Sequence, residues 1–223
     1  MDDGRRRGGA QWYSFVAWTV PALSLGLCAI AAWLGRRSNS DATHYFFESG
    51  DNGHPGIVGI ATAMGFYSVA VIAGILALVP APPRVRHAWS GAAVLFAVLA
   101  VDELLQLHAA VPHGDLIARS IYWISLIVIV RALAPYLRGK PGVAMLGAGI
   151  LLLATSEILD LYPPGDDPAY RLHQLVSVLE ESTLSVGTWC LAVACLGFAS
   201  AILAPAADLS RSEDLEPAQL RRG

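Results

Sequence analysis

The chain has 223 residues, of which 55% are hydrophobic and only 15% charged, and its formal net charge is -3. Soluble domains usually carry about 25% charged residues, so the composition excludes an ordinary soluble domain. The near-neutral charge excludes the basic stripe of a nucleic-acid-binding protein. Its cysteines, Cys28, Cys190 and Cys195, all lie in apolar runs, which favours small core residues over disulfides or a metal site.

Six apolar stretches recur along the chain, each close to the roughly 20 residues that a helix needs to cross a bilayer. They cover residues 13–34, 57–79, 89–111, 116–137, 143–162 and 172–203. The first is longer than the apolar region of a signal peptide. Turns with proline and glycine separate the later ones, at 80–83, 112–115, 139–142 and 163–166. The sequence therefore predicts an all-α fold, a polytopic transmembrane bundle of about six helices.

Aromatic residues fall near the ends of the predicted helices. They include Trp12, Trp33, Trp89, Tyr122 and Tyr162. Tryptophan and tyrosine are enriched at both membrane–water interfaces, so we expect these side chains to form an aromatic belt.

The basic residues predict the orientation of the bundle. With the N-terminus inside, the cytoplasmic side receives Arg5, Arg6, Arg7, Arg84, Arg86, Arg138, Lys140, Arg211, Arg221 and Arg222. Only Arg36, Arg37 and Arg171 fall outside, which is a positive-inside bias. We expect a protein of the inner (plasma) membrane with both termini cytoplasmic. Its parts would be an N-terminal segment (1–12), the transmembrane domain (13–203) and a polar, disordered tail (204–223).

Two segments of the chain resemble each other. Residues 99–108 read LAVDELLQLH, and residues 153–162 read LATSEILDLY. Each ends a helix predicted to rise toward the outside, and a proline-containing turn and a descending helix follow each. We interpret the third and fourth helices and the fifth and sixth helices as a parallel repeat of one helical hairpin, as in some transporters.

Acidic residues collect in the outer half of the predicted bundle. Asp102 and Glu103 on the third helix, Glu157 on the fifth, and Glu180 and Glu181 on the sixth reach one level, about 10 Å below the outer surface. An intramembrane carboxylate costs about 2.5–3.5 kcal/mol on insertion scales and usually faces a cavity or a partner. Adjacent residues on a helix point about 100° apart. The sequence therefore predicts that Asp102 or Glu103 shares one polar cavity with Glu157 and with Glu180 or Glu181, and that only one residue of each adjacent pair faces it.

Histidines at the outer ends of the predicted helices add metal-ligating chemistry, because imidazole and carboxylate together suit transition metals. The candidate ligands are Asp102, Glu103, His108, His113, Glu157, His173, Glu180 and Glu181. The cofactor of such a site would be a divalent transition metal. Without a metal, crowded carboxylates would hold protons. Arg119, which enters the fourth helix from outside, is a plausible salt-bridge partner for one of the acids.

The polar helices carry a family resemblance. Residues 101–108, VDELLQLH, resemble an Asp-Glu…Leu-His helix of uncharacterised bacterial multi-pass membrane proteins, and residues 179–181, LEE, resemble their paired-glutamate helix. The resemblance covers two helices and implies a membrane bundle without a particular activity. In that signature a glutamate often follows the histidine, whereas Ala109 follows His108 here.

Three functions stay open from the sequence. The first is an outward-facing intramembrane site that binds a metal ion, protons or a small polar ligand. The second is a metal-dependent membrane hydrolase acting on a lipid-like substrate, and the third is a structural subunit of a membrane complex. Besides the lipid bilayer, the expected partners are a second copy of the chain or another membrane subunit. Nucleotide-binding and serine-hydrolase motifs are absent from the sequence.

Overall fold

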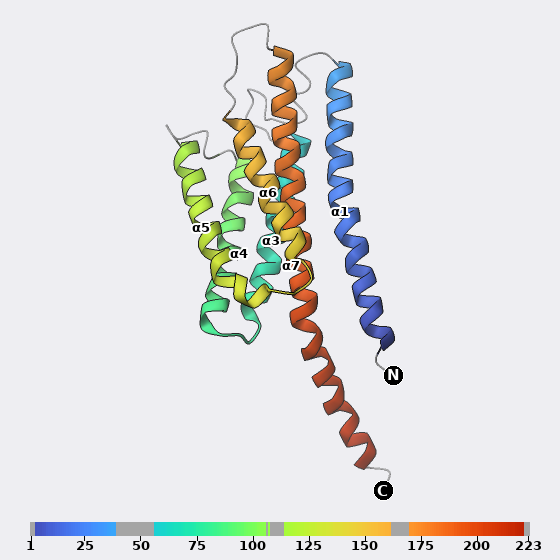
Figure 1. Ribbon diagram of the computed structural model, residues 1–223. Helices are drawn as coiled ribbons and strands as arrows, with labels where there is room; N and C mark the ends of the chain where they lie inside the picture. Colours follow the sequence, from blue (N-terminus) through green and yellow to red (C-terminus); the bar gives the residue numbers. More distant parts are fainter. Residues whose placement is uncertain (1–2, 39–55, 106, 108–113, 162–169, 221–223) are drawn as a thin grey trace.

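The computed structural model describes residues 3–38, 56–105, 107, 114–161 and 170–220 (Figure 1). Within these ranges the fold is all-helical, as predicted. The helices are α1 (Asp3–Ser38), α3 (Ile57–Leu78), α4 (Pro83–Leu105), α5 (Gly114–Leu137), α6 (Val143–Asp160) and α7 (Tyr170–Leu220). Each contains a stretch long and apolar enough to cross a membrane. The chain is therefore a multi-pass membrane protein built as a helical bundle.

Helix α7 is the central element of the bundle. It packs against α6, α3 and α1, while α4 packs mainly against α3. Among the described helices, α5 packs closely only against α4. In Figure 1, α5 and α1 accordingly stand on opposite sides of the bundle.

Small residues set the close packing around α7. A Cβ atom added at Gly149 of α6 would lie 2.7 Å from Leu191 Cδ2 and 2.9 Å from the carbonyl oxygen of Gly187, both on α7. A Cβ atom at Gly65 of α3 would lie 2.7 Å from Thr188 Cγ2. Lipid supplies no hydrophobic drive between helices, so close approach of backbones through small residues is what holds such helices together.

Helix α4 begins six residues earlier than the sequence predicts, at Pro83 instead of Trp89. Proline suits the first position of a helix, because its fixed φ is helical and the N–H group that it lacks would have no partner within the helix there. The backbone N–H groups of Val85 and Arg86 donate to the carbonyl of Pro82 and close the first turn. The Arg86 Nε atom also donates to the carbonyl of Ala77, near the end of α3, at 3.4 Å.

Trp89 faces the interior of the bundle and not the lipid, as a belt residue would. Trp89 is 3% exposed and packs on Phe198 of α7, with ring centroids 6.2 Å apart. Tyr122 of α5 is also buried, so the belt prediction is wrong for both. Trp12 and Trp33 of α1 are exposed, as belt residues would be.

Helix α7 continues past its apolar span to Leu220, where the sequence predicts a disordered tail from residue 204. Figure 1 shows this part running alone, away from the bundle. The segment contains four Ala and three Leu, which favour helix, but also Pro205 and Pro217, which disfavour it. The three-part division of the chain stays a prediction.

The two predicted hairpins differ in packing. Helices α6 and α7 lie in close contact along their length, whereas α4 and α5 touch much less. Glu103 and Glu157, which correspond in the sequence repeat, both lie near the C-terminal ends of their helices. The repeat itself stays a prediction.

Candidate functional site

A polar cavity of about 200 Å³ lies among five helices. Its lining consists of Phe66 from α3, Leu99, Asp102 and Glu103 from α4, Arg119 and Tyr122 from α5, Leu153, Ser156, Glu157 and Asp160 from α6, and Glu180, Glu181 and Leu184 from α7. Every acidic residue whose side chain the structure describes belongs to this lining. The cavity is therefore where the described acidic side chains are gathered.

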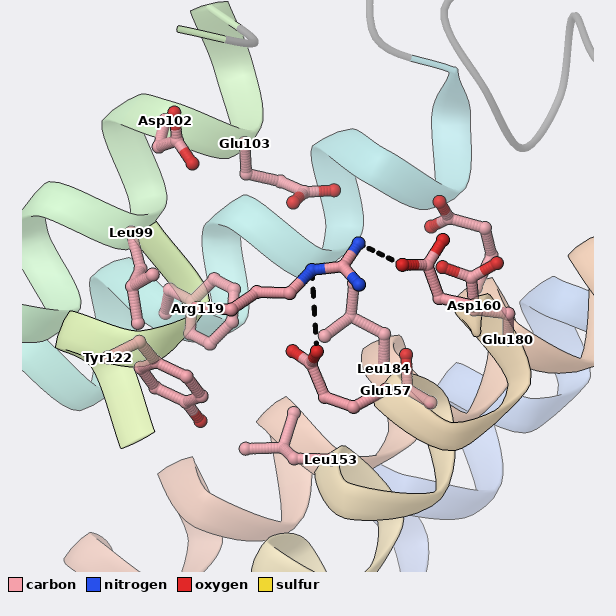
Figure 2. A pocket seen from close by; sticks show the side chains of 13 residues that line it. Leu99, Asp102, Glu103, Arg119, Tyr122, Leu153, Glu157, Asp160, Glu180 and Leu184 are labelled. Carbon is pink, nitrogen blue, oxygen red and sulfur yellow. Dashed lines mark ion pairs between the residues drawn. The ribbon is translucent and has the colours of Figure 1, made fainter. Parts of the chain in front are cut away.

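The predicted convergence of the carboxylates is confirmed. Asp102 and Glu103 reach the cavity from α4, and Glu180 and Glu181 reach it from α7. Figure 2 shows Asp102 and Glu103 on one side of the Arg119 guanidinium and Glu180 on the other. Both members of each adjacent pair line the cavity, although the sequence predicted that only one of each pair would face a shared centre. The cavity is wide enough to meet side chains about 100° apart on a helix.

Arg119 joins α5 to α6 across the cavity. Its Nε atom lies 3.5 Å from Glu157 Oε2, and its Nη2 atom forms an ion pair with Asp160 Oδ2 (Figure 2). The two carboxylates are three residues apart, so they lie on one face of α6 and one guanidinium reaches both. The sequence predicted an ion pair of Arg119 with one acid, and the structure gives it two. All three side chains are partly buried.

Tyr122 contributes a polar atom without a hydrogen bond. Its side chain is 7% exposed and lines the cavity, and no hydrogen-bond partner for its hydroxyl oxygen lies in the described part of the chain. Leaving a buried hydroxyl unsatisfied costs about 1–3 kcal/mol. Sequence reasoning assigned Tyr122 to the membrane interface. Tyr122 lies one turn from Arg119 on the same helical face, and this spacing could have predicted its place in the cavity wall.

A second, apolar cleft of about 40 Å³ lies between the same helices, nearer the turn at 139–142. The same five helices line both spaces. On α5 the lining passes from Tyr122 to Leu126, and on α4 it passes from Leu99 to Phe96, in each case within one helical turn. Apart from Trp89 and Cys195, the cleft is lined by aliphatic side chains and phenylalanine. The sequence analysis did not predict this cleft.

The structure brings together the acidic candidates for metal binding, whereas the histidine candidates are not among the described side chains. His108 and His113 lie outside the described residues, and the side chain of His173 is not described either. In the parts of the chain that are described, no three His, Cys, Asp or Glu side chains are grouped so that they could hold a metal ion. The metal-ligand role of the eight candidates stays a prediction.

The fold and the cavity define a class: multi-pass membrane proteins with an acidic cavity among their helices. Residues 22–198 match a family described as a domain of unknown function (DUF8692), and the chain belongs to that family. The matched region contains every residue that lines the cavity and the cleft. No curated protein and no solved structure matches the chain.

Proposed function

We propose that this protein binds a cation in the acidic cavity, from the extracytoplasmic side of the plasma membrane. The observation that carries the proposal is the lining itself, in which six carboxylates and one guanidinium face a space of about 200 Å³. Carboxylates are placed in a membrane only at a cost, and a cation in their midst offsets it. The volume is below that of pockets for drug-sized ligands, about 300–1,000 Å³, and suits an ion or a small head group.

The direction of access follows from the charges of the chain. Arg84, Arg86, Arg138 and Lys140 lie at the end of the bundle opposite the cavity, where α4 begins and α5 ends. Positive residues favour the cytoplasmic side, which leaves the cavity near the outer face with both termini inside. A proton, a divalent transition metal or an organic ammonium ion would each satisfy the proposal.

Hydrolysis of a lipid-like substrate is the second candidate function, and the apolar cleft below the cavity favours it. A metal-dependent reaction would also require ligands beyond the grouped acids, and His108, His113 and His173 are the sequence candidates. Release of fatty acid or alcohol from a lipid by the purified protein, lost on chelation, would establish this function.

The test of cation binding is the response of thermal unfolding to added cations. We expect Mn²⁺, Zn²⁺, Ca²⁺, methylammonium or acid to raise the Tm of the purified full chain, because a ligand that binds only the folded state stabilises it. The variant E180Q/E181Q should lose that response. The control E213Q/E216Q removes two carboxylates from the C-terminal part of the chain and should keep it.

Elemental analysis of the same preparations shows whether a metal accompanies the protein. If none of these cations shifts the wild-type Tm more than that of E180Q/E181Q, the cavity does not bind cations. The carboxylates would then belong to a structural polar network.

A further inference from the structure

We propose that a cation entering the cavity displaces Arg119 from Glu157 and Asp160, and that this displacement releases the outer end of α5 from α6. The inference rests on the proposed cation site and describes how binding there is coupled to a movement of the bundle. We call these three side chains the Arg119 latch. The proposal combines the ion pairs of the latch, the packing of α5 and the hinge at the other end of that helix.

Arg119 is the natural competitor of a bound cation. It carries the only basic side chain among the described residues that line the cavity, and it pairs with both acids of α6 there (Figure 2). The other titratable groups that face this space are Asp102 and Glu103 of α4, Tyr122 of α5, and Glu180 and Glu181 of α7. A cation in the same space is attracted by the carboxylates and repelled by the guanidinium, since both effects are strong where water is scarce. A cation bound at the acids of α6 therefore takes the place of Arg119.

The latch joins two helices that otherwise touch little. Helices α5 and α6 are consecutive, but among the described helices α5 packs closely only against α4. Arg119 lies near the start of α5, and Glu157 and Asp160 lie near the end of α6, so the ion pairs join the open ends of this hairpin. The Trp123 side chain of α5 adds a hydrogen bond to Glu157. Both ties end on the acids of α6, so a cation bound at these acids breaks both.

Helix α6 stays in place when the latch opens. It packs on α7 along its length, with close backbone contact at Gly149. The turn before it is fixed in the same way, because a Cβ atom at Gly142 would lie 2.5 Å from the carbonyl oxygen of Ala194 on α7. The helix that moves is therefore α5.

The inner end of α5 supplies the hinge. Pro135 lies inside the helix, close to its end at Leu137. It has no N–H to donate to the carbonyl of Arg131, so the helix is weakened at this point. The outer part of α5 can therefore bend at Pro135 while the turn that follows stays on α7.

The size of the movement follows from the length of the moving arm. Ile121, near the outer end of α5, is about 21 Å from Pro135 along the helix at a rise of about 1.5 Å per residue. Sharp kinks at proline begin at about 20°, and a bend of about 20° carries Ile121 about 7 Å. We expect the outer ends of α5 and α6 to separate by up to about 7 Å.

The test measures distances between pairs of spin labels on the full chain in lipid nanodiscs, by double electron–electron resonance in a cysteine-free background. The outer pair is Ile121→Cys on α5 and Ile158→Cys on α6, which are 59% and 68% exposed and do not line the cavity. The inner pair is Ala134→Cys and Val143→Cys, at exposed positions next to the turn. The cations are Zn²⁺, Ca²⁺, methylammonium and acid. We expect each one that raises the Tm to lengthen the outer distance and to leave the inner distance unchanged.

Variants separate the release of Arg119 from other effects of cations. Arg119→Met should have a longer outer distance than wild type before any cation is added, and should lengthen less afterwards. Arg131→Met removes an exposed guanidinium from the same helix and should behave as wild type. If Arg119→Met does not fold, E157Q/D160N removes the charges on α6 and should show the same lengthened outer distance without cations.

The possible outcomes separate the two proposals. A constant outer distance while one of the four cations raises the Tm would overturn the latch and leave the cation site standing. Outer distances in Arg119→Met and E157Q/D160N equal to that of wild type would do the same, and so would equal lengthening of the inner pair. If none of the four cations raises the Tm, the latch is wrong. If Mn²⁺ does not raise it either, the cation site is wrong as well.

Discussion

The contact of α6 with α7 through Gly149 gives the most direct test of the fold. A methyl group at Gly149 would lie 2.7 Å from Leu191 Cδ2 and 2.9 Å from the backbone oxygen of Gly187. The leucine can rotate, but the carbonyl oxygen cannot move without the helix. Gly147, half a turn away on the same helix, has no atom within 4 Å of such a methyl group. The two positions therefore form a matched pair for Gly→Ala substitution.

The magnitude follows from the difference between the two variants. Replacing Gly by Ala in a helix gains up to about 1 kcal/mol, and this gain is common to both positions and cancels. The remaining cost of overpacking is about 1–3 kcal/mol. We expect Gly149→Ala to be less stable than Gly147→Ala by that amount. For a chain of this size each kcal/mol corresponds to about 2–4 °C in Tm.

The assay is thermal unfolding of both variants in detergent, followed by tryptophan fluorescence. Since separation of α6 from α7 also moves Glu157 away from Glu180, the Gly149→Ala variant should respond less to cations than Gly147→Ala does. Equal Tm values for the two variants would refute the packing of α6 on α7 through this glycine.

Two further predictions concern the ion pairs and the orientation. Arg119→Met should lower the free energy of unfolding by about 1–3 kcal/mol, less than for a fully buried pair because the three side chains are partly exposed, and neutralising both acids in R119M/E157Q/D160N should restore part of that loss; denaturant unfolding measures both, and no restoration would mean that the acids do not depend on Arg119. In a cysteine-free background, Leu161→Cys, just after α6, should react with a membrane-impermeant thiol reagent in intact cells, and His87→Cys should react only after permeabilisation. Both side chains are exposed, and they lie at opposite ends of the bundle. The reverse labelling pattern would invert the orientation.

The meeting of the acids could be predicted from the sequence. The rise of a helix is constant, so counting from the turns placed Asp102, Glu157 and Glu180 at one level, and all three line one cavity. Helix ends were less predictable. Apolar runs mark where the membrane begins, whereas capping and proline mark where the helix begins, and the two differ by six residues at α4.

The sequence by itself determined the number of membrane-spanning helices, because length and apolarity set the spans one helix at a time. It also determined that acids from three helices meet. The tertiary structure decided which helical faces meet: that Arg119 joins two acids of α6, that Tyr122 is buried in the cavity wall, and that an apolar cleft runs below it. These features depend on the rotation of each helix about its axis. Contacts between residues distant in sequence, such as Gly149 with Gly187 and Gly65 with Thr188, set that rotation. Hydropathy carries little of that information, because in a membrane the lipid-facing side of a helix is as apolar as the packed side.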